Sequence, residues 1–123
     1  MATIKSYTDI SQSKKLAEIL TLESADMWYS YYGNPKYNLV IAYKGEQWFL
    51  CPIKLAYKDI PCWSLAALLN ILKDKITFGG NSPEGWFCCS TTKNPTKLLT
   101  IYRDSLIDAC YEIIIKLHEL KML

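Results

Sequence analysis

The sequence predicts an α+β fold: three helices on a small antiparallel sheet of four to five strands. Three observations support this fold class. Residues 104–121 carry apolar side chains at helical spacing. Short segments rich in β-branched and aromatic residues flank glycine-containing turns. The predicted elements follow in the order α-β-β-α-β-β-α, which is typical of helices packed on an antiparallel sheet.

The composition indicates a single globular domain over residues 1–123. Half of the 123 residues are hydrophobic, and a chain of this length can bury a substantial core. The 14 basic and 12 acidic residues nearly balance, and Lys14-Lys15 is the only adjacent basic pair, so nucleic-acid binding is not expected. No apolar run approaches the roughly 20 residues that cross a bilayer, and no secretory signal begins the sequence. We therefore expect a cytoplasmic protein that does not bind membranes.

The first half of the sequence predicts one helix followed by a hairpin. A helix is expected near residues 12–21, capped by Ser11 or Ser13, because apolar residues recur there at intervals of three and four. Residues 38–43 and 47–51 are expected to be strands joined by a short turn at 44–46. A further short extended segment is expected at 55–60.

The second half predicts two helices around a second strand pair. Residues 64–73 should form a helix that is apolar on nearly every face and capped by Ser64. Strands are expected at 76–78 and 86–90, joined by a glycine-rich loop at 79–85. Residues 98–102 are either a fifth strand or an irregular connection, and residues 104–121 form the last helix.

A helix with no polar face is usually enclosed, either by its own protein or by a partner chain. The last helix also has a wide apolar arc, which Ile107, Tyr111 and Ile115 extend. We therefore expect a homodimer, although a monomer that encloses both helices is the alternative. The self-association surface would comprise five residues: Leu65, Leu68, Leu69, Ile71 and Leu72.

Catalytic and metal-binding patterns are weak in this sequence. The five cysteines include no C-x-x-C pair, so small buried side chains are their simplest interpretation. His118 is the single histidine, and it lies roughly 12 Å along one helix from Cys110, too far for a catalytic pair. No enzyme activity, cofactor or metal is expected. The carboxylates near turns or helix starts, which suit capping, are Asp26, Asp59, Glu84 and Asp104.

Aromatic residues crowd the segment 26–37. Rings that carry hydroxyls suit the anchoring of a protein partner or stacking on a base or sugar. The alternative is a strand whose rings fill the core. The candidate binding surface comprises Trp28, Tyr29, Tyr31, Tyr32, Lys36 and Tyr37.

Four motifs occur together along the chain: Ser-Lys-Lys-Leu-Ala-Glu-Ile-Leu at 13–20, Leu-Glu-Ser-Ala-Asp-Met at 22–27, Pro-Cys-Trp-Ser-Leu-Ala-Ala-Leu-Leu at 61–69, and Asp-Ala-Cys-Tyr-Glu at 108–112. With these motifs the chain resembles a group of small uncharacterised proteins encoded by phages and mobile elements of gut bacteria. Here a longer stretch separates Asn94-Pro95 from Asp108 than in that pattern, and residues 28–58 match loosely. The resemblance implies an accessory protein of a mobile element but no activity.

The sequence thus favours a non-enzymatic module that binds an unidentified protein partner. A protein that sequesters a nucleotide-like ligand at a dimer interface is the alternative. That alternative requires the aromatic rings to converge with Lys36, Lys54 or Arg103. An enzyme that uses His118 or paired carboxylates is the least favoured interpretation.

Overall fold

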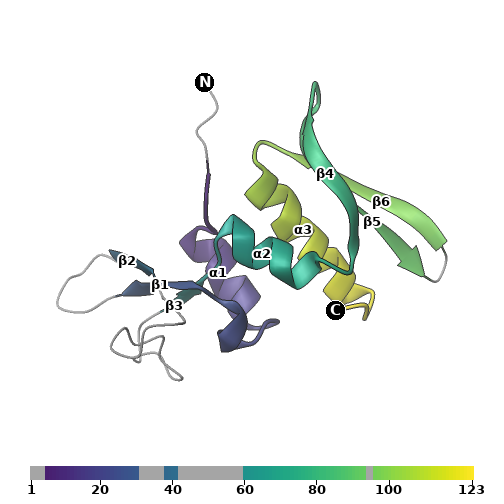
Figure 1. Ribbon diagram of the computed structural model, residues 1–123. Coiled ribbons are helices and arrows are strands. Elements are labelled where there is room, and N and C mark those ends of the chain that lie inside the picture. Colours follow the sequence, from purple (N-terminus) through teal and green to yellow (C-terminus); the bar gives the residue numbers. More distant parts are fainter. Residues whose placement is uncertain (1–4, 31–37, 42–59, 94–95) are drawn as a thin grey trace. The chain divides into compact units, whose positions relative to one another are not determined.

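The computed structural model describes residues 5–30, 38–41, 60–93 and 96–123. These residues form three α-helices, one 3-10 helix and two three-stranded antiparallel sheets (Figure 1). The predicted α+β class is therefore confirmed, but the described strands form two sheets of three and not one sheet of four to five. The elements are α1 (Ile10–Ala17), η1 (Leu22–Ser24), β1 (Met27–Ser30), β2 (Asn38–Ile41), β3 (Ile60–Cys62), α2 (Leu65–Leu72), β4 (Ile76–Ser82), β5 (Gly85–Lys93), β6 (Thr96–Arg103) and α3 (Leu106–Glu119).

Contacts between residues divide the chain into two compact units. The amino-terminal unit is Tyr7–Ala67, and the carboxy-terminal unit is Leu68–Leu123 together with Lys5 and Ser6. The single domain expected over residues 1–123 stays a prediction.

Helix α1 begins at Asp9, not at a serine. The Gln12 N–H donates to Asp9 Oδ1 at 2.8 Å, and the Asp9 N–H donates to Gln12 Oε1 at 3.1 Å, which together form a capping box. The predicted caps Ser11 and Ser13 are therefore wrong. Ser13 is buried, and its hydroxyl lies 2.7 Å from Thr8 Oγ1.

The sheet of the amino-terminal unit has the strand order β2-β1-β3. Its core comprises Met27, Tyr29, Ile60 and Cys62, against which Ile10 packs. The predicted strand at 38–43 is present as β2, paired with β1, but its predicted partner at 47–51 lies outside the described residues. Of the extended segment expected at 55–60, only Ile60 is described, as the first residue of β3.

The sheet of the carboxy-terminal unit has the order β4-β5-β6, with β5 in the centre. The loop predicted at 79–85 is much shorter, because Gly79 and Gly80 continue β4 and only Pro83 and Glu84 connect the strands. Gly85 has φ of +123°, and a Cβ there would lie 2.8 Å from the Arg103 carbonyl oxygen. Only glycine therefore fits at this position after the turn. Residues 98–102, left open by the sequence, belong to strand β6.

Helix α3 confirms the clearest sequence prediction. It begins at Ser105, whose Oγ accepts from the Asp108 N–H at 3.1 Å, and it packs on β5 and β6 (Figure 1). Ile107, expected on a second surface, is fully buried, whereas Tyr111 and Ile115 are half-buried. The buried residues of α3 are Ile107, Ala109, Cys110, Ile113, Ile114 and Leu117.

Candidate functional site

The aromatic segment predicted as a binding surface is only partly described. Trp28 and Tyr29 belong to β1, where Trp28 is half-buried and Tyr29 is 8% exposed. These two residues fit the alternative of a strand that contributes to the core. The other candidates of this surface lie outside the described residues: Tyr31, Tyr32, Lys36 and Tyr37.

Tyr29 is held inside the amino-terminal unit by a hydrogen bond. Its hydroxyl donates to the Thr8 carbonyl oxygen at 2.7 Å. Burial raises the pKa of its phenol, with a smaller contribution from the neighbouring Cys62. Tyr29 is therefore a core residue that ties β1 to the segment before α1, and its expected place on a recognition surface needs correction.

Cys62 shares the same acceptor. Its thiol donates to the Thr8 carbonyl oxygen at 3.4 Å, and its sulfur lies 3.6 Å from Thr8 Oγ1. Burial raises the pKa of the Cys62 thiol, although hydrogen bonds with its hydroxyl neighbours oppose that shift. A fully buried thiol with a raised pKa is a poor nucleophile. Cys62 is therefore a structural residue.

The Pro-Cys-Trp-Ser block connects β3 to α2 through polar contacts. The indole N–H of the fully buried Trp63 donates to Ser24 Oγ at 2.9 Å. The Ser64 N–H donates to Asp26 Oδ1 at 2.9 Å, and the Ser64 hydroxyl donates to Asp26 Oδ2. Ser64 Oγ in turn accepts from the Ala67 N–H at 3.2 Å, which confirms the predicted cap. The most distinctive motif of the sequence thus begins a helix.

The predicted self-association surface on α2 is enclosed at two of its five residues, Leu68 and Leu72, which are fully buried. The self-association itself stays a prediction. Leu65, Leu69 and Ile71 are half-buried. When every face of a helix is apolar, the sequence alone does not show which face packs in the core and which face could contact a partner chain.

The weak catalytic candidates are not brought together by any described contact. His118 is exposed near the end of α3, while Cys110 on the same helix is buried against Cys88 of β5. Glu84 accepts a hydrogen bond from Ser82 Oγ at 3.2 Å within the β4–β5 turn. Asp104 is exposed, and Asp59 lies outside the described residues. Among the described residues, no group of three or more histidine, cysteine or acidic side chains could hold a metal ion.

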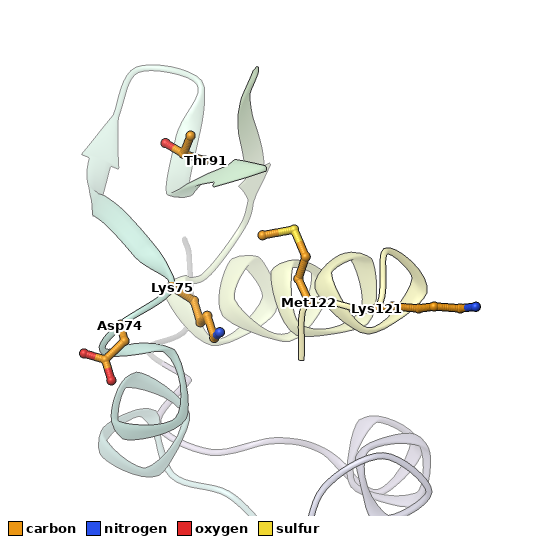
Figure 2. Close-up of a pocket in the computed structure, with 5 residues that line it drawn as sticks. All are labelled: Asp74, Lys75, Thr91, Lys121 and Met122. Atoms are coloured by element: carbon orange, nitrogen blue, oxygen red, sulfur yellow. The ribbon is translucent and has the colours of Figure 1, made fainter. Parts of the chain in front are cut away.

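A shallow pocket of about 350 Å³ lies in the carboxy-terminal unit, lined by Asp74, Lys75, Thr91, Lys121 and Met122. Figure 2 shows that its charged side chains do not converge, since Asp74 and Lys121 point in opposite directions. Anion recognition requires cations directed at one point. The arrangement of these side chains is that of a solvated surface.

A more distinctive feature is the face of the β4–β5–β6 sheet opposite α3. Leu98 is 56% exposed and Tyr102 is 44% exposed, although both are large and apolar. The Tyr102 ring lies against Phe87, with centroids 5.8 Å apart and planes tilted by 43°. Thr100 Oγ1 lies 3.2 Å from the sulfur of Cys89 on the same face. We call Phe87, Leu98, Thr100 and Tyr102 the outer sheet surface.

The outer sheet surface contains no charged residue. Along β6 the two charged residues next to this surface are Lys97 and Arg103. The guanidinium of Arg103 lies 3.9 Å from Glu112 Oε2 of α3. The other face of the sheet is covered, since Cys88 contacts Cys110 of α3. Sequence reasoning missed this surface because residues 98–102 were not assigned to a strand. The alternation of Leu98, Thr100 and Tyr102 was the available signal.

Comparisons with protein-family models, curated proteins and solved structures found no match to this chain. Within the described residues, no helix combines the length and apolar character that a membrane span requires.

Proposed function

We propose that this protein is a non-enzymatic interaction module that binds another protein through the outer sheet surface. The observation that carries the proposal is that two large apolar residues of β6, Leu98 and Tyr102, are both exposed on the same face of the sheet. Neighbouring exposed apolar side chains on a flat surface are typical of protein-binding sites.

The chemistry of the surface suits a protein partner. Tyrosine and phenylalanine provide large contact areas with little loss of side-chain freedom, and they are enriched in the centre of interfaces. The Phe87 ring lies against the Tyr102 ring, with centroids 5.8 Å apart. A ring that already contacts a neighbouring side chain before binding loses less entropy when a partner docks.

The setting of the proposal rests on the sequence resemblance to mobile-element proteins, among which small binding proteins are an expected class. Tyr31, Tyr32, Lys36 and Tyr37 remain candidates for a second contact. For the ligand-sequestering alternative, the charge of Arg103 already faces Glu112, and Lys36 and Lys54 lie outside the described residues. That alternative stays a prediction.

Site-specific photocrosslinking in living cells tests the proposal. A photoreactive phenylalanine analogue is placed at position 98 or at position 102, and cells are irradiated before extraction. The matched control places it at Leu120, a leucine on the other face of the unit that is 49% exposed. We expect discrete adducts of defined mass from positions 98 and 102 and none from 120. Equal diffuse labelling from all three positions would contradict a protein-binding role for this surface.

A further inference from the structure

We propose that Cys88 and Cys110 form a reversible disulfide bond that fastens α3 to β5 under oxidising conditions. In the structure both residues are free, buried thiols, which corresponds to the reduced form. The inference goes beyond the proposed function and does not depend on it, because the two thiols lie on the face of the sheet that α3 covers and not on the outer sheet surface.

The sheet directs the Cys88 side chain at α3. Cys88 pairs with Gly79 of β4, and directly paired residues of an antiparallel sheet lie on the same face. A Cβ at Gly79 would lie 3.7 Å from Leu106 Cδ1, so this is the face that α3 covers. The next residue, Cys89, points to the other face, where its sulfur lies 3.2 Å from Thr100 Oγ1. Of the two adjacent cysteines, Cys88 is therefore the one that faces the helix.

Helix α3 directs Cys110 at Cys88. Leu106 and Cys110 are separated by one helical turn, which places both side chains on the same face of α3. Leu106 lies against Gly79, and Cys110 is fully buried where α3 packs on β5 (Figure 1). The thiols of Cys88 and Cys110 are hydrogen-bonded to each other. Two sulfur atoms in such contact need only a small movement to reach the length of a disulfide bond.

The hydrogen bond between the thiols distinguishes their roles. It lowers the pKa of the Cys88 thiol, because a thiolate there accepts the Cys110 S–H, although burial opposes this shift. The same hydrogen bond, together with burial, raises the pKa of the Cys110 thiol. Since the thiolate is the form that attacks an oxidant, Cys88 is the sulfur that reacts first. Cys110 is then the neighbour that completes the disulfide.

Hydrogen peroxide, a small uncharged oxidant, closes this disulfide in two steps. The Cys88 thiolate attacks one peroxide oxygen and the O–O bond breaks. The leaving hydroxide takes up the proton that Cys88 released, which gives water and a sulfenic acid at Cys88. The Cys110 sulfur then attacks the Cys88 sulfur, so that the S–S bond forms and the S–O bond breaks. The second hydroxide leaves with the Cys110 proton as water. The sulfur pair loses two electrons, which reduce the peroxide to water.

The disulfide would close a loop of about 20 residues that contains β6 and the start of α3. Such a link restricts the unfolded chain more than the folded one, and it therefore stabilises the carboxy-terminal unit. Because the bond would be buried, a reducing thiol reaches it only when the unit opens locally. The stability of this unit would thus respond to the redox conditions around the protein.

Mass spectrometry of the full-length protein after treatment with hydrogen peroxide tests the inference. The parent is Cys51→Ser, so that all remaining thiols belong to the described residues. We expect the parent to lose the mass of two hydrogen atoms, and a reductant to reverse this change. Fragmentation of the digested protein should place the bond between Cys88 and Cys110. The melting temperature should rise by at least about 5 °C on oxidation.

Cys89→Ser in this parent is the matched control, because it removes the adjacent thiol on the other face of the sheet. It should form the same link to Cys110, whereas Cys88→Ser should form none. If Cys88→Ser does not fold, fragmentation between the adjacent cysteines of the parent still assigns the bond. A bond from Cys89, a covalent dimer, or oxygen added to sulfur without a link would overturn the inference. So would an unchanged parent after overnight exposure that fully oxidises Leu120→Cys, a thiol placed at an exposed position.

Discussion

The backbone N–H of Ser64 donates to Asp26 Oδ1 at 2.9 Å, so a carboxylate 38 residues earlier in the sequence helps to set where α2 begins. The Ser64 hydroxyl completes the arrangement, because it donates to the same carboxylate while its oxygen accepts from the Ala67 N–H. One side chain therefore joins the cap of a helix to the residue that precedes β1.

Ser64→Ala should destabilise the protein by about 1–2 kcal/mol, because the first turn of α2 loses its side-chain cap and Asp26 loses a donor. The free energy of unfolding in urea measures this change. Ser11→Ala is the control, since Ser11 is exposed on α1 and is not the cap of that helix, so its effect should stay within about 0.5 kcal/mol. Equal losses in the two variants would show that the Asp26–Ser64 contact contributes nothing.

Tyr29→Phe should cost about 1 kcal/mol at neutral pH, because it removes the hydrogen bond to the Thr8 carbonyl oxygen while the ring stays in the core. Chemical denaturation at pH 7 measures the difference from the wild type. In this variant the Thr8 carbonyl oxygen still accepts a hydrogen bond from the Cys62 thiol, which limits the loss of stability.

The difference in the free energy of unfolding between Tyr29→Phe and the wild type should become smaller at alkaline pH. Burial raises the pKa of the folded-state phenol above its usual value of about 10. The stability linked to the neutral phenol is therefore complete below pH 10 and is lost as the pH rises further. Because the Cys62 thiol interacts with the Tyr29 hydroxyl, the comparison measures the two groups together. A gap that stays constant between pH 7 and pH 11 would contradict the burial of this hydroxyl.

Gly85→Ala should destabilise the protein by about 1–3 kcal/mol, because its φ of +123° and the Arg103 carbonyl oxygen at 2.8 Å leave no room for a Cβ. Gly80→Ala is the matched control in the same hairpin. A Cβ at Gly80 would meet the Phe87 ring at 3.7 Å, an ordinary contact, so its effect should be much smaller. The melting temperatures of the two variants measure this difference. A larger loss of stability in Gly80→Ala than in Gly85→Ala would contradict the steric requirement at Gly85.

The four described thiols should not react with an aromatic disulfide reagent in the folded protein. Cys62, Cys88, Cys89 and Cys110 are all buried, and the hydrogen bond with Cys88 and burial hold the pKa of the Cys110 thiol above its usual range. The experiment uses Cys51→Ser, so that only these four remain. Labelling should proceed at the rate of unfolding and accelerate with urea. One thiol that reacts at once in native buffer would show that its burial is wrong.

The sequence predicted the elements whose signals are local. Helix α3 was expected because its apolar residues repeat over four turns, and the cap of α2 was expected because Ser64 directly precedes an apolar run. The start of α1 was missed because Asp9 and three nearby serines are all good caps, and the reciprocal Gln12 contact decides between them only in three dimensions.

Features that depend on pairing between distant residues could not be predicted. Gly79 and Gly80 suggested a loop, yet they lie in β4 opposite Cys88 and Phe87, where a neighbouring strand outweighs low strand propensity. The sequence did not decide whether Tyr29 lies in the core or on a recognition surface, because its acceptor is a backbone carbonyl 21 residues away. The outer sheet surface became visible only once β6 was placed beside β5.

The carbonyl of Thr8 receives donors from two strands, Tyr29 of β1 and Cys62 of β3. A carbonyl belongs to the main chain, so no substitution at position 8 can delete it. Replacements there test the hydroxyl alone, which accepts from the Trp63 N–H at 3.2 Å. A redesign of this unit therefore has to treat the two oxygens of Thr8 separately, because the carbonyl is served from positions 29 and 62 and the hydroxyl serves the backbone of position 63.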